Sequence, residues 1–151
     1  MTKTKKEITQ LDSMILKTNL KQEVYRKSVG TFALLKEVLK ELADEYREKL
    51  KNKVDDNVLP VYQEKGPFEA EFKIGGDMLI FSMHSNVFVF DRDHPIWKLD
   101  YVKANTMNSY CGVFNIYNFL TDSFRYNRME DLGYLIARIF VNRENHFFVE
   151  G

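Results

Sequence analysis

The first third of the sequence repeats its apolar residues at helical spacing. Over residues 20–52 the apolar positions fall three or four apart, which predicts one long helix. A shorter pattern over residues 5–17 predicts a separate helix before it, with a break near Thr18–Asn19 where a cap signal occurs. A helix of the longer kind spans about 50 Å. We therefore expect part of its apolar stripe to pack on a second chain.

Residues 77–91 form the stretch around which the predicted sheet is organised. The pattern predicts two strands, Asp77–Met83 and Asn86–Asp91, joined by a tight turn. Both strands carry apolar residues on both parities, and a strand of that kind lies inside a sheet with both faces covered. We therefore expect other parts of the chain on each side of the sheet.

The neighbouring strands follow more regular patterns. Phe68–Ile74 alternates apolar and charged residues, which is typical of an edge strand with one wet face. The Gly75-Gly76 dipeptide predicts a hairpin turn into the next strand. Cys111–Leu120 predicts a further strand with apolar residues on both sides, and His146–Glu150 predicts the last one.

A third helix is predicted near the C-terminal end. Residues 128–142 carry apolar side chains nearly all round a helical wheel, and Asn127 precedes them as an N-cap. Such a helix has to be buried on most of its surface. Together the patterns predict an α+β fold with two N-terminal helices, the second one long, an antiparallel sheet of about five or six strands, and one buried C-terminal helix followed by a last strand.

Composition agrees with a globular domain. At 151 residues, with 44% hydrophobic and 29% charged residues, the chain can bury a core without a disulfide or a metal. We expect a single α+β domain over residues 1–151, with a helical arm or hairpin over 1–54 and the sheet plus helix over 60–151. The apolar pattern stops one residue before Gly151, so one interpretation is a longer natural protein.

Charge and cysteine content narrow the classes of partner and compartment. The formal net charge is zero, which argues against nucleic acid as the partner. No run approaches the roughly 18 apolar residues that span a bilayer, so we expect no membrane partner. The single cysteine, Cys111, excludes an internal disulfide. We expect a cytoplasmic protein.

Four residues have the side-chain chemistry of a metal site. His84, Asp91, Asp93 and His94 offer imidazoles and carboxylates, which are ligands for zinc or iron. However, His84 and Asp91 flank opposite ends of one predicted strand, roughly 17–20 Å apart, so one ion cannot bind both. We therefore assign no metal ligand and no cofactor.

Cys111 is the other candidate for chemistry, since no common catalytic, dinucleotide or phosphate-binding motif occurs. It could act as a nucleophile with His84 or His94 as its base, and Gly112 leaves room for a substrate carbonyl. However, cysteine is among the residues most often buried, and Cys111 opens an apolar strand. We assign no catalytic residue.

The polar stretch over residues 105–110 is the strongest candidate for ligand binding. Its amide and hydroxyl groups follow two aromatic residues, a composition typical of a pocket for a neutral ligand. The alternative is turn chemistry, in which Asn and Ser bond to their own backbone. A separate stretch over residues 124–128 interleaves rings with cations. The candidate ligand-binding residues are Trp97, Tyr101, Asn105, Asn108, Tyr110 and Arg125.

The surplus of apolar faces, beside the lack of catalytic motifs, favours a non-enzymatic function. We predict a soluble binding or protein-interaction module of unknown ligand that self-associates as a homodimer, and we keep a further protein partner open. The alternative is a small enzyme or small-molecule receptor with a polar pocket around Trp97–Cys111.

Overall fold

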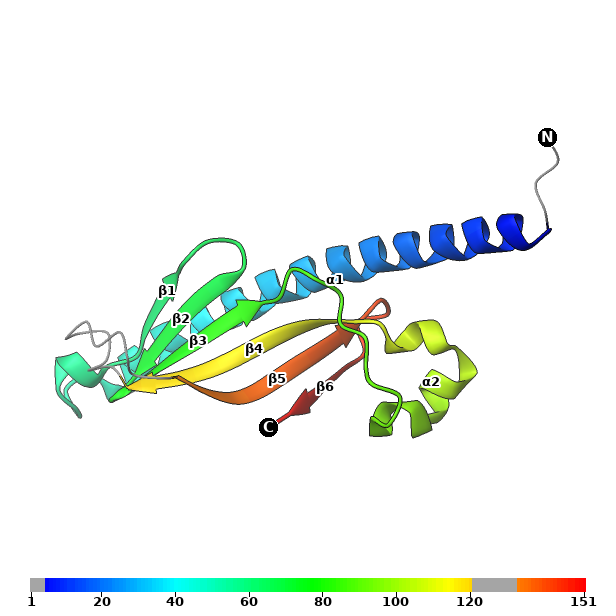
Figure 1. Ribbon diagram of the computed structural model, residues 1–151. Helices are drawn as coiled ribbons and strands as arrows, with labels where there is room; N and C mark the ends of the chain where they lie inside the picture. Colours follow the sequence, from blue (N-terminus) through cyan, green and yellow to red (C-terminus); the bar gives the residue numbers. More distant parts are fainter. Residues whose placement is uncertain (1–4, 121–132) are drawn as a thin grey trace.

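A long helix and a six-stranded antiparallel sheet make up most of the fold (Figure 1). The computed structural model describes residues 5–120 and 133–151. The helices are α1 (Lys5–Leu50), η1 (Asp56–Val58), η2 (Pro95–Lys98), α2 (Asp100–Ala104) and η3 (Thr106–Ser109), the η elements being 3-10 helices. The strands are β1 (Val61–Glu64), β2 (Glu69–Ile74), β3 (Asp77–Met83), β4 (Cys111–Leu120), β5 (Tyr134–Asn142) and β6 (Phe147–Glu150).

The sheet is a meander in which the spatial order of the strands is their order in the sequence. Gly75 has φ 57° in the turn that joins β2 to β3, which confirms the predicted Gly75-Gly76 hairpin. The strands predicted over Cys111–Leu120 and near the C-terminal end are also confirmed. β2 was predicted to be an edge strand, but this is wrong, because β1 pairs along its outer side. The sequence patterns did not predict β1.

The N-terminal region is one helix rather than two. α1 is 46 residues long and passes through Thr18–Asn19 without a break, so the predicted break is wrong. The flanking lysine, leucine and glutamine residues are strong helix formers, and they outweigh one weak cap signal. The helix ends at Leu50, where Asn52 has φ 63° and the amide of Lys53 donates to the Leu50 carbonyl.

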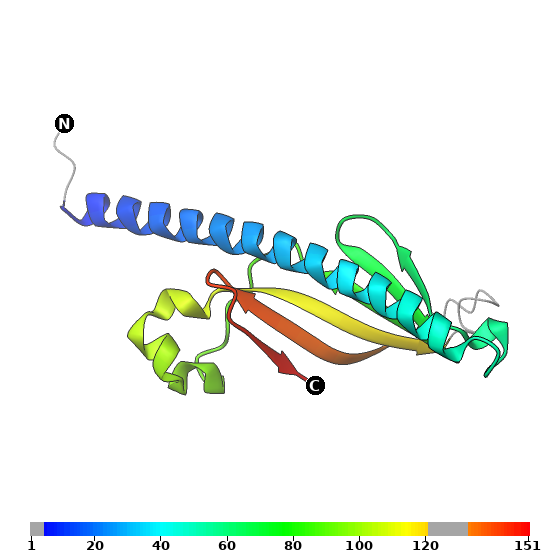
Figure 2. The same cartoon turned by 180° about the vertical axis from the view of Figure 1, so that it is seen from behind.

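The first turns of α1 extend beyond the sheet (Figure 2). Every side chain over residues 9–19 is exposed, including those of Leu11, Met14, Ile15 and Leu16. The helix meets the rest of the molecule at Leu20, which is buried. Part of the predicted surplus of apolar helix surface therefore lies in this extension.

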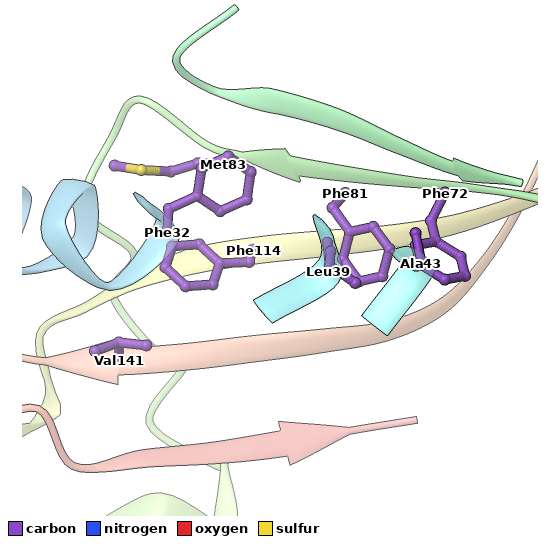
Figure 3. Close-up of a cluster of buried hydrophobic side chains, with 8 residues drawn as sticks. All are labelled: Phe32, Leu39, Ala43, Phe72, Phe81, Met83, Phe114 and Val141. Atoms are coloured by element: carbon purple, nitrogen blue, oxygen red, sulfur yellow. The ribbon is translucent and has the colours of Figure 1, made fainter. Parts of the chain in front are cut away.

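The first hydrophobic core lies between α1 and one face of the sheet, which we call the helix face (Figure 3). Its buried side chains come from α1 and from β2 to β5: Phe32, Leu39, Ala43, Phe72, Phe81, Met83, Phe114 and Val141. In Figure 3 β6 lies beside β5 and contributes none of these side chains.

Gly112 lets α1 approach β4 closely. A β-carbon at Gly112 would lie 1.9 Å from Ser28 Oγ and 2.6 Å from Ser28 Cβ, so glycine is required. Ser28 is buried, and its hydroxyl donates to the Val24 carbonyl at 2.7 Å. The space beside Cys111 that was considered for a substrate carbonyl is therefore filled by α1.

The connection between β3 and β4 covers part of the opposite face. The strand predicted over Asn86–Asp91 is absent: within residues 84–110 only Phe88 makes an isolated bridge, to Cys111. β3 pairs with β4 itself along that side, so no place for another strand is left there. The rings of Phe88 and Phe90 instead join a second core with Ile96, Trp97, Tyr101, Val102, Cys111, Val113, Phe140 and Phe148.

Tyr134–Asn142 is strand β5, so the predicted helix over 128–142 is wrong in its described part. Residues 128–132 lie outside the described residues, and no helix follows β4 in residues 133–151. β5 pairs with β4 on one side and β6 on the other. Its isoleucine, phenylalanine and valine favour a strand, and its apolar residues reach both cores because they occupy both parities.

Candidate functional site

Two of the predicted ligand residues meet near the β5–β6 turn. Asn142 Nδ2 donates to Tyr101 Oη at 2.9 Å and to the Asn108 carbonyl at 3.1 Å. Asn108 Nδ2 donates to the Tyr101 carbonyl at 3.0 Å, and Tyr101 Oη donates to Glu144 Oε1 at 2.5 Å. The structure therefore brings Tyr101 and Asn108 into one polar network.

Asn142, at the centre of this network, was not predicted. It is buried, and its Oδ1 accepts from the amides of Glu144 and His146 at 3.0 and 2.9 Å. Both ends of its side chain are therefore used to close the turn, in which Asn145 has φ 61°. The polar residues that follow the apolar run of β5 are the sequence signal that could have identified this turn.

The predicted residues Trp97 and Asn105 serve local structure. Asn105 Oδ1 accepts from the Met107 amide at 3.0 Å and caps η3, which is the turn chemistry held as the alternative. Trp97 Nε1 donates to the Asp91 carbonyl at 2.8 Å, and the Arg92 guanidinium lies 4.8 Å from its ring centre.

The last two predicted residues do not join the network in the described structure. Tyr110 is half-buried directly before β4, and its amide caps η3. Arg125 lies outside the described residues. The six candidates therefore do not converge on one pocket in the part of the chain that the structure describes.

An apolar trough runs along the opposite face beside β6. One groove of about 310 Å³ includes Tyr101, Asn108 and Asn142 in its wall. A second groove of about 410 Å³ adjoins it. Because the two grooves share Ile96, Leu99 and Phe148, we describe them together as the trough.

Two titratable side chains along the trough, those of Cys111 and Tyr101, have raised pKa values. Burial raises the pKa of the Cys111 thiol to about 12, so the thiol stays protonated at neutral pH. Burial, followed by the hydrogen bond to Glu144, raises the pKa of Tyr101. These shifts do not favour Cys111 as a nucleophile or Tyr101 as a base.

His94 is fixed through both ring nitrogens. Its Nδ1 accepts from the Ile96 amide at 3.0 Å, which caps η2 and places the ring proton on Nε2. Nε2 then donates to Glu150 Oε1 at 2.6 Å, and Arg138 Nη2 donates to Glu150 Oε2 at 3.0 Å. The histidine therefore joins η2 to β6 rather than presenting a free nitrogen.

The residues considered for a metal site are separated. His84 Nδ1 accepts from the Asn86 amide at 3.1 Å beyond the end of β3, while His94 contacts β6. Within the described parts of the chain, no three histidine, cysteine, aspartate or glutamate side chains are grouped so as to hold a metal ion.

β6 is the sheet edge beside the trough. The Asn142 amide donates to the His146 carbonyl, and hydrogen-bonded pairs alternate along an antiparallel ladder. Phe148 and Glu150 therefore direct their backbone groups toward β5, whereas Phe147 and Val149 direct theirs outward. The side chains of Phe147 and Val149 are 70% and 57% exposed.

On the helix face, α1 passes the β5–β6 turn and carries further exposed apolar side chains. Thr31 Oγ1 donates to Asn145 Oδ1 at 3.4 Å, so this side of α1 faces the β5–β6 turn. Leu34 and Val38 follow Thr31 by about one and two turns on the same side, and both are exposed. We call the exposed side chains of Phe147 and Val149 on β6 the shelf.

No protein-family model, curated protein or solved structure matches this chain. No helix in the described residues is long and apolar enough to cross a membrane. The interpretation of the site therefore depends on its own geometry, in which the trough and the shelf lie on the two faces of β6, the last strand of the sheet in the described residues.

Proposed function

We propose that the protein is a non-enzymatic protein-interaction module that binds an extended segment of another chain along β6. The observation that carries this proposal is a sheet edge with exposed apolar surface on both faces. An added strand would bond to the outward amides and carbonyls of Phe147 and Val149. Its side chains alternate in direction, so they would fall in turn on the shelf and in the trough.

The size and chemistry of the two surfaces support a peptide strand. The shelf is formed by two large apolar side chains that are exposed on neighbouring positions of one strand face, and exposed apolar surface is typical of a protein contact. In the trough, Leu99 is 52% exposed and Phe148 forms part of the floor. Main-chain hydrogen bonds would supply sequence-independent affinity, and the two apolar surfaces would select for alternating apolar residues.

The alternative of a small-molecule receptor has weaker support. A specific ligand pocket presents polar groups that are free to bond to the ligand. Here the Asn142 side chain bonds to the Tyr101 hydroxyl and to the Asn108 carbonyl, and the Tyr101 hydroxyl donates to Glu144 in the β5–β6 turn. The Asn108 side chain donates to the Tyr101 carbonyl and accepts from Arg143. The same bonding weakens the support for an enzyme that would work from this network.

Binding of a defined peptide tests the proposal. The probe is a fluorescein-labelled short peptide that alternates valine and threonine between terminal lysines, followed by anisotropy. We expect saturable binding that weakens at least about tenfold in Val149→Lys, because the substitution puts a charge on the shelf.

Two controls make the result specific. Val61→Lys places the same charge on the other sheet edge, at a residue that is also exposed, and should leave binding unchanged. A peptide with N-methyl groups on alternate amides cannot form the strand ladder and should not bind. Equal binding of the methylated peptide, or of Val149→Lys, would contradict the proposal.

A further inference from the structure

We infer that the strand bound at β6 is the β6 strand of a second copy of this chain, joined about a two-fold axis at Phe148. The inference rests on the proposed function, since it requires that β6 accept a strand. It adds the identity of the partner and the register of the pair. The two sheets would then continue into each other edge to edge.

The outward backbone groups limit the registers that a symmetric pair can adopt. Phe147 and Val149 have to form the hydrogen-bonded pairs, because their amides and carbonyls face away from β5. An antiparallel pair with both helix faces on the same side, in which both residues find partners within residues 145–151, places its axis at Phe147, Phe148 or Val149. The side chains decide among these three registers.

With the axis at Phe148, the opposite face gains a continuous row of rings. Phe148 would lie across from its counterpart in the second copy. Within one copy Phe140 and Phe148 already stack with their ring centres 4.8 Å apart and their planes at 18°. The pair would therefore extend this stack from two rings to four, across the join and beside the troughs.

The same register places an imidazole across from a carboxylate at both ends of the join. His146 of each copy would lie across from Glu150 of the other, on the same face as Phe148. Glu150 is already held by Arg138 and His94, so its carboxylate has a fixed position. His146 stacks on Tyr101 with 4.3 Å between ring centres, so its ring is also oriented.

The other two registers have unfavourable neighbours. An axis at Phe147 would bring Glu150 toward Glu144 in the β5–β6 turn of the second copy, and two like charges brought together at the join are unfavourable. An axis at Val149 would place Glu150 across from Phe148, which leaves the carboxylate against a ring. The side chains therefore select the axis at Phe148.

The helix face agrees with this register and indicates a modest affinity. Phe147 would lie across from Val149 of the second copy, so the two shelves form one apolar surface. β6 has only 4 residues. The main-chain contact is therefore short, and we expect an interface at the lower end of the usual size range, near 1,200 Å² in total.

Disulfide trapping determines both the partner and the register. Three full-length variants carry Cys111→Ala together with Phe147→Cys, Val149→Cys or, as a control on β1, Val61→Cys. Across the proposed join, residues 147 and 149 form a hydrogen-bonded pair with about 5.5 Å between Cα atoms, within disulfide range. We expect the mixture of the Phe147→Cys and Val149→Cys chains to cross-link several-fold faster than either alone, and Val61→Cys not to cross-link.

The outcomes separate this inference from the proposed function. Fastest trapping of Phe147→Cys alone, or of Val149→Cys alone, would indicate one of the other axes and overturn the register. Light scattering that shows only monomer at about 100 µM wild-type protein would overturn the second copy as partner, even if the valine–threonine peptide binds. Loss of peptide binding as well would overturn the proposed function itself.

Discussion

The two edges of the sheet differ in what protects them. At β1, Lys36 Nζ on α1 lies 2.6 Å from Glu64 Oε1, and Arg47 Nη1 donates to the Pro60 carbonyl at 3.0 Å. The side chain of Tyr62 packs against the first core. At β6 the outward-facing residues are Phe147 and Val149, and both are exposed and apolar.

The difference shows which edge is closed to pairing. Charged residues on an edge strand, and a helix beside it, discourage the addition of another strand. β1 has both protections, because α1 packs against it through charged and apolar side chains. At β6 the one charged residue, Glu150, is bonded to Arg138 and His94 and points away from the shelf.

The largest expected effect concerns the close contact between α1 and β4. Gly112→Ala should lower the free energy of unfolding by about 3 kcal/mol, because the added carbon would overlap Ser28 and force α1 away from β4. Urea unfolding measures the loss. Gly30→Ala is the matched control: nothing lies within 4 Å of its β-carbon, and it should stabilise by about 0.5–1 kcal/mol. Equal stability of the Gly112 variant and the wild type would contradict the close contact.

A smaller effect is expected at Cys111, which is buried in the second core and not in the first. Burial raises the pKa of Cys111 from 9.0 to about 12, so folding favours the protonated thiol. This contribution is fully present below pH 9 and is lost as the pH rises toward 12, amounting to about 2 kcal/mol between pH 7.5 and 10.5. Cys111→Ala should lack this part of the alkaline decline when both proteins are unfolded in urea with reductant. Parallel declines in the two proteins would show that Cys111 does not contribute.

The smallest effect is expected at the charges of the β1 edge. Glu64→Gln should lower the free energy of unfolding by about 0.5 kcal/mol at low salt, because Glu64 is half exposed and its pair with Lys36 is partly screened. The difference from the wild type should vanish in about 1 M salt. A loss that persists at high salt would show that Glu64 acts through packing instead.

Much of the sheet could be predicted because its signals are local. The Gly75-Gly76 turn requires a backbone that glycine adopts easily, and Cys111–Leu120 is apolar on both parities because both cores need it. Residues 134–142 were misassigned because an apolar run on all sides suits a buried helix as well as a buried strand. Their β-branched and aromatic content was the signal that favoured the strand.

The candidate site could be predicted only in part, for a reason of topology. Tyr101 and Asn108 were identified from composition, but Asn142 joins them from a position 34 residues after Asn108. The strand at Phe147–Glu150 was expected, whereas its place at the edge depends on the order of all six strands. A one-dimensional pattern shows that a strand is apolar on both faces but not that one side lacks a neighbour.

The sequential order of the strands has a consequence for the entropy of folding. Hairpins such as β2–β3 and β5–β6 close over a few residues, so each constrains little of the unfolded chain. The contact between Thr31 and Asn145 closes a loop of 114 positions. Compared with a loop of about ten residues, such a closure loses about 2 kcal/mol more in chain entropy. The docking of α1 beside the β5–β6 turn therefore carries a larger entropic penalty than the closure of either hairpin, and the burial of Val24 and Phe32 helps to offset it.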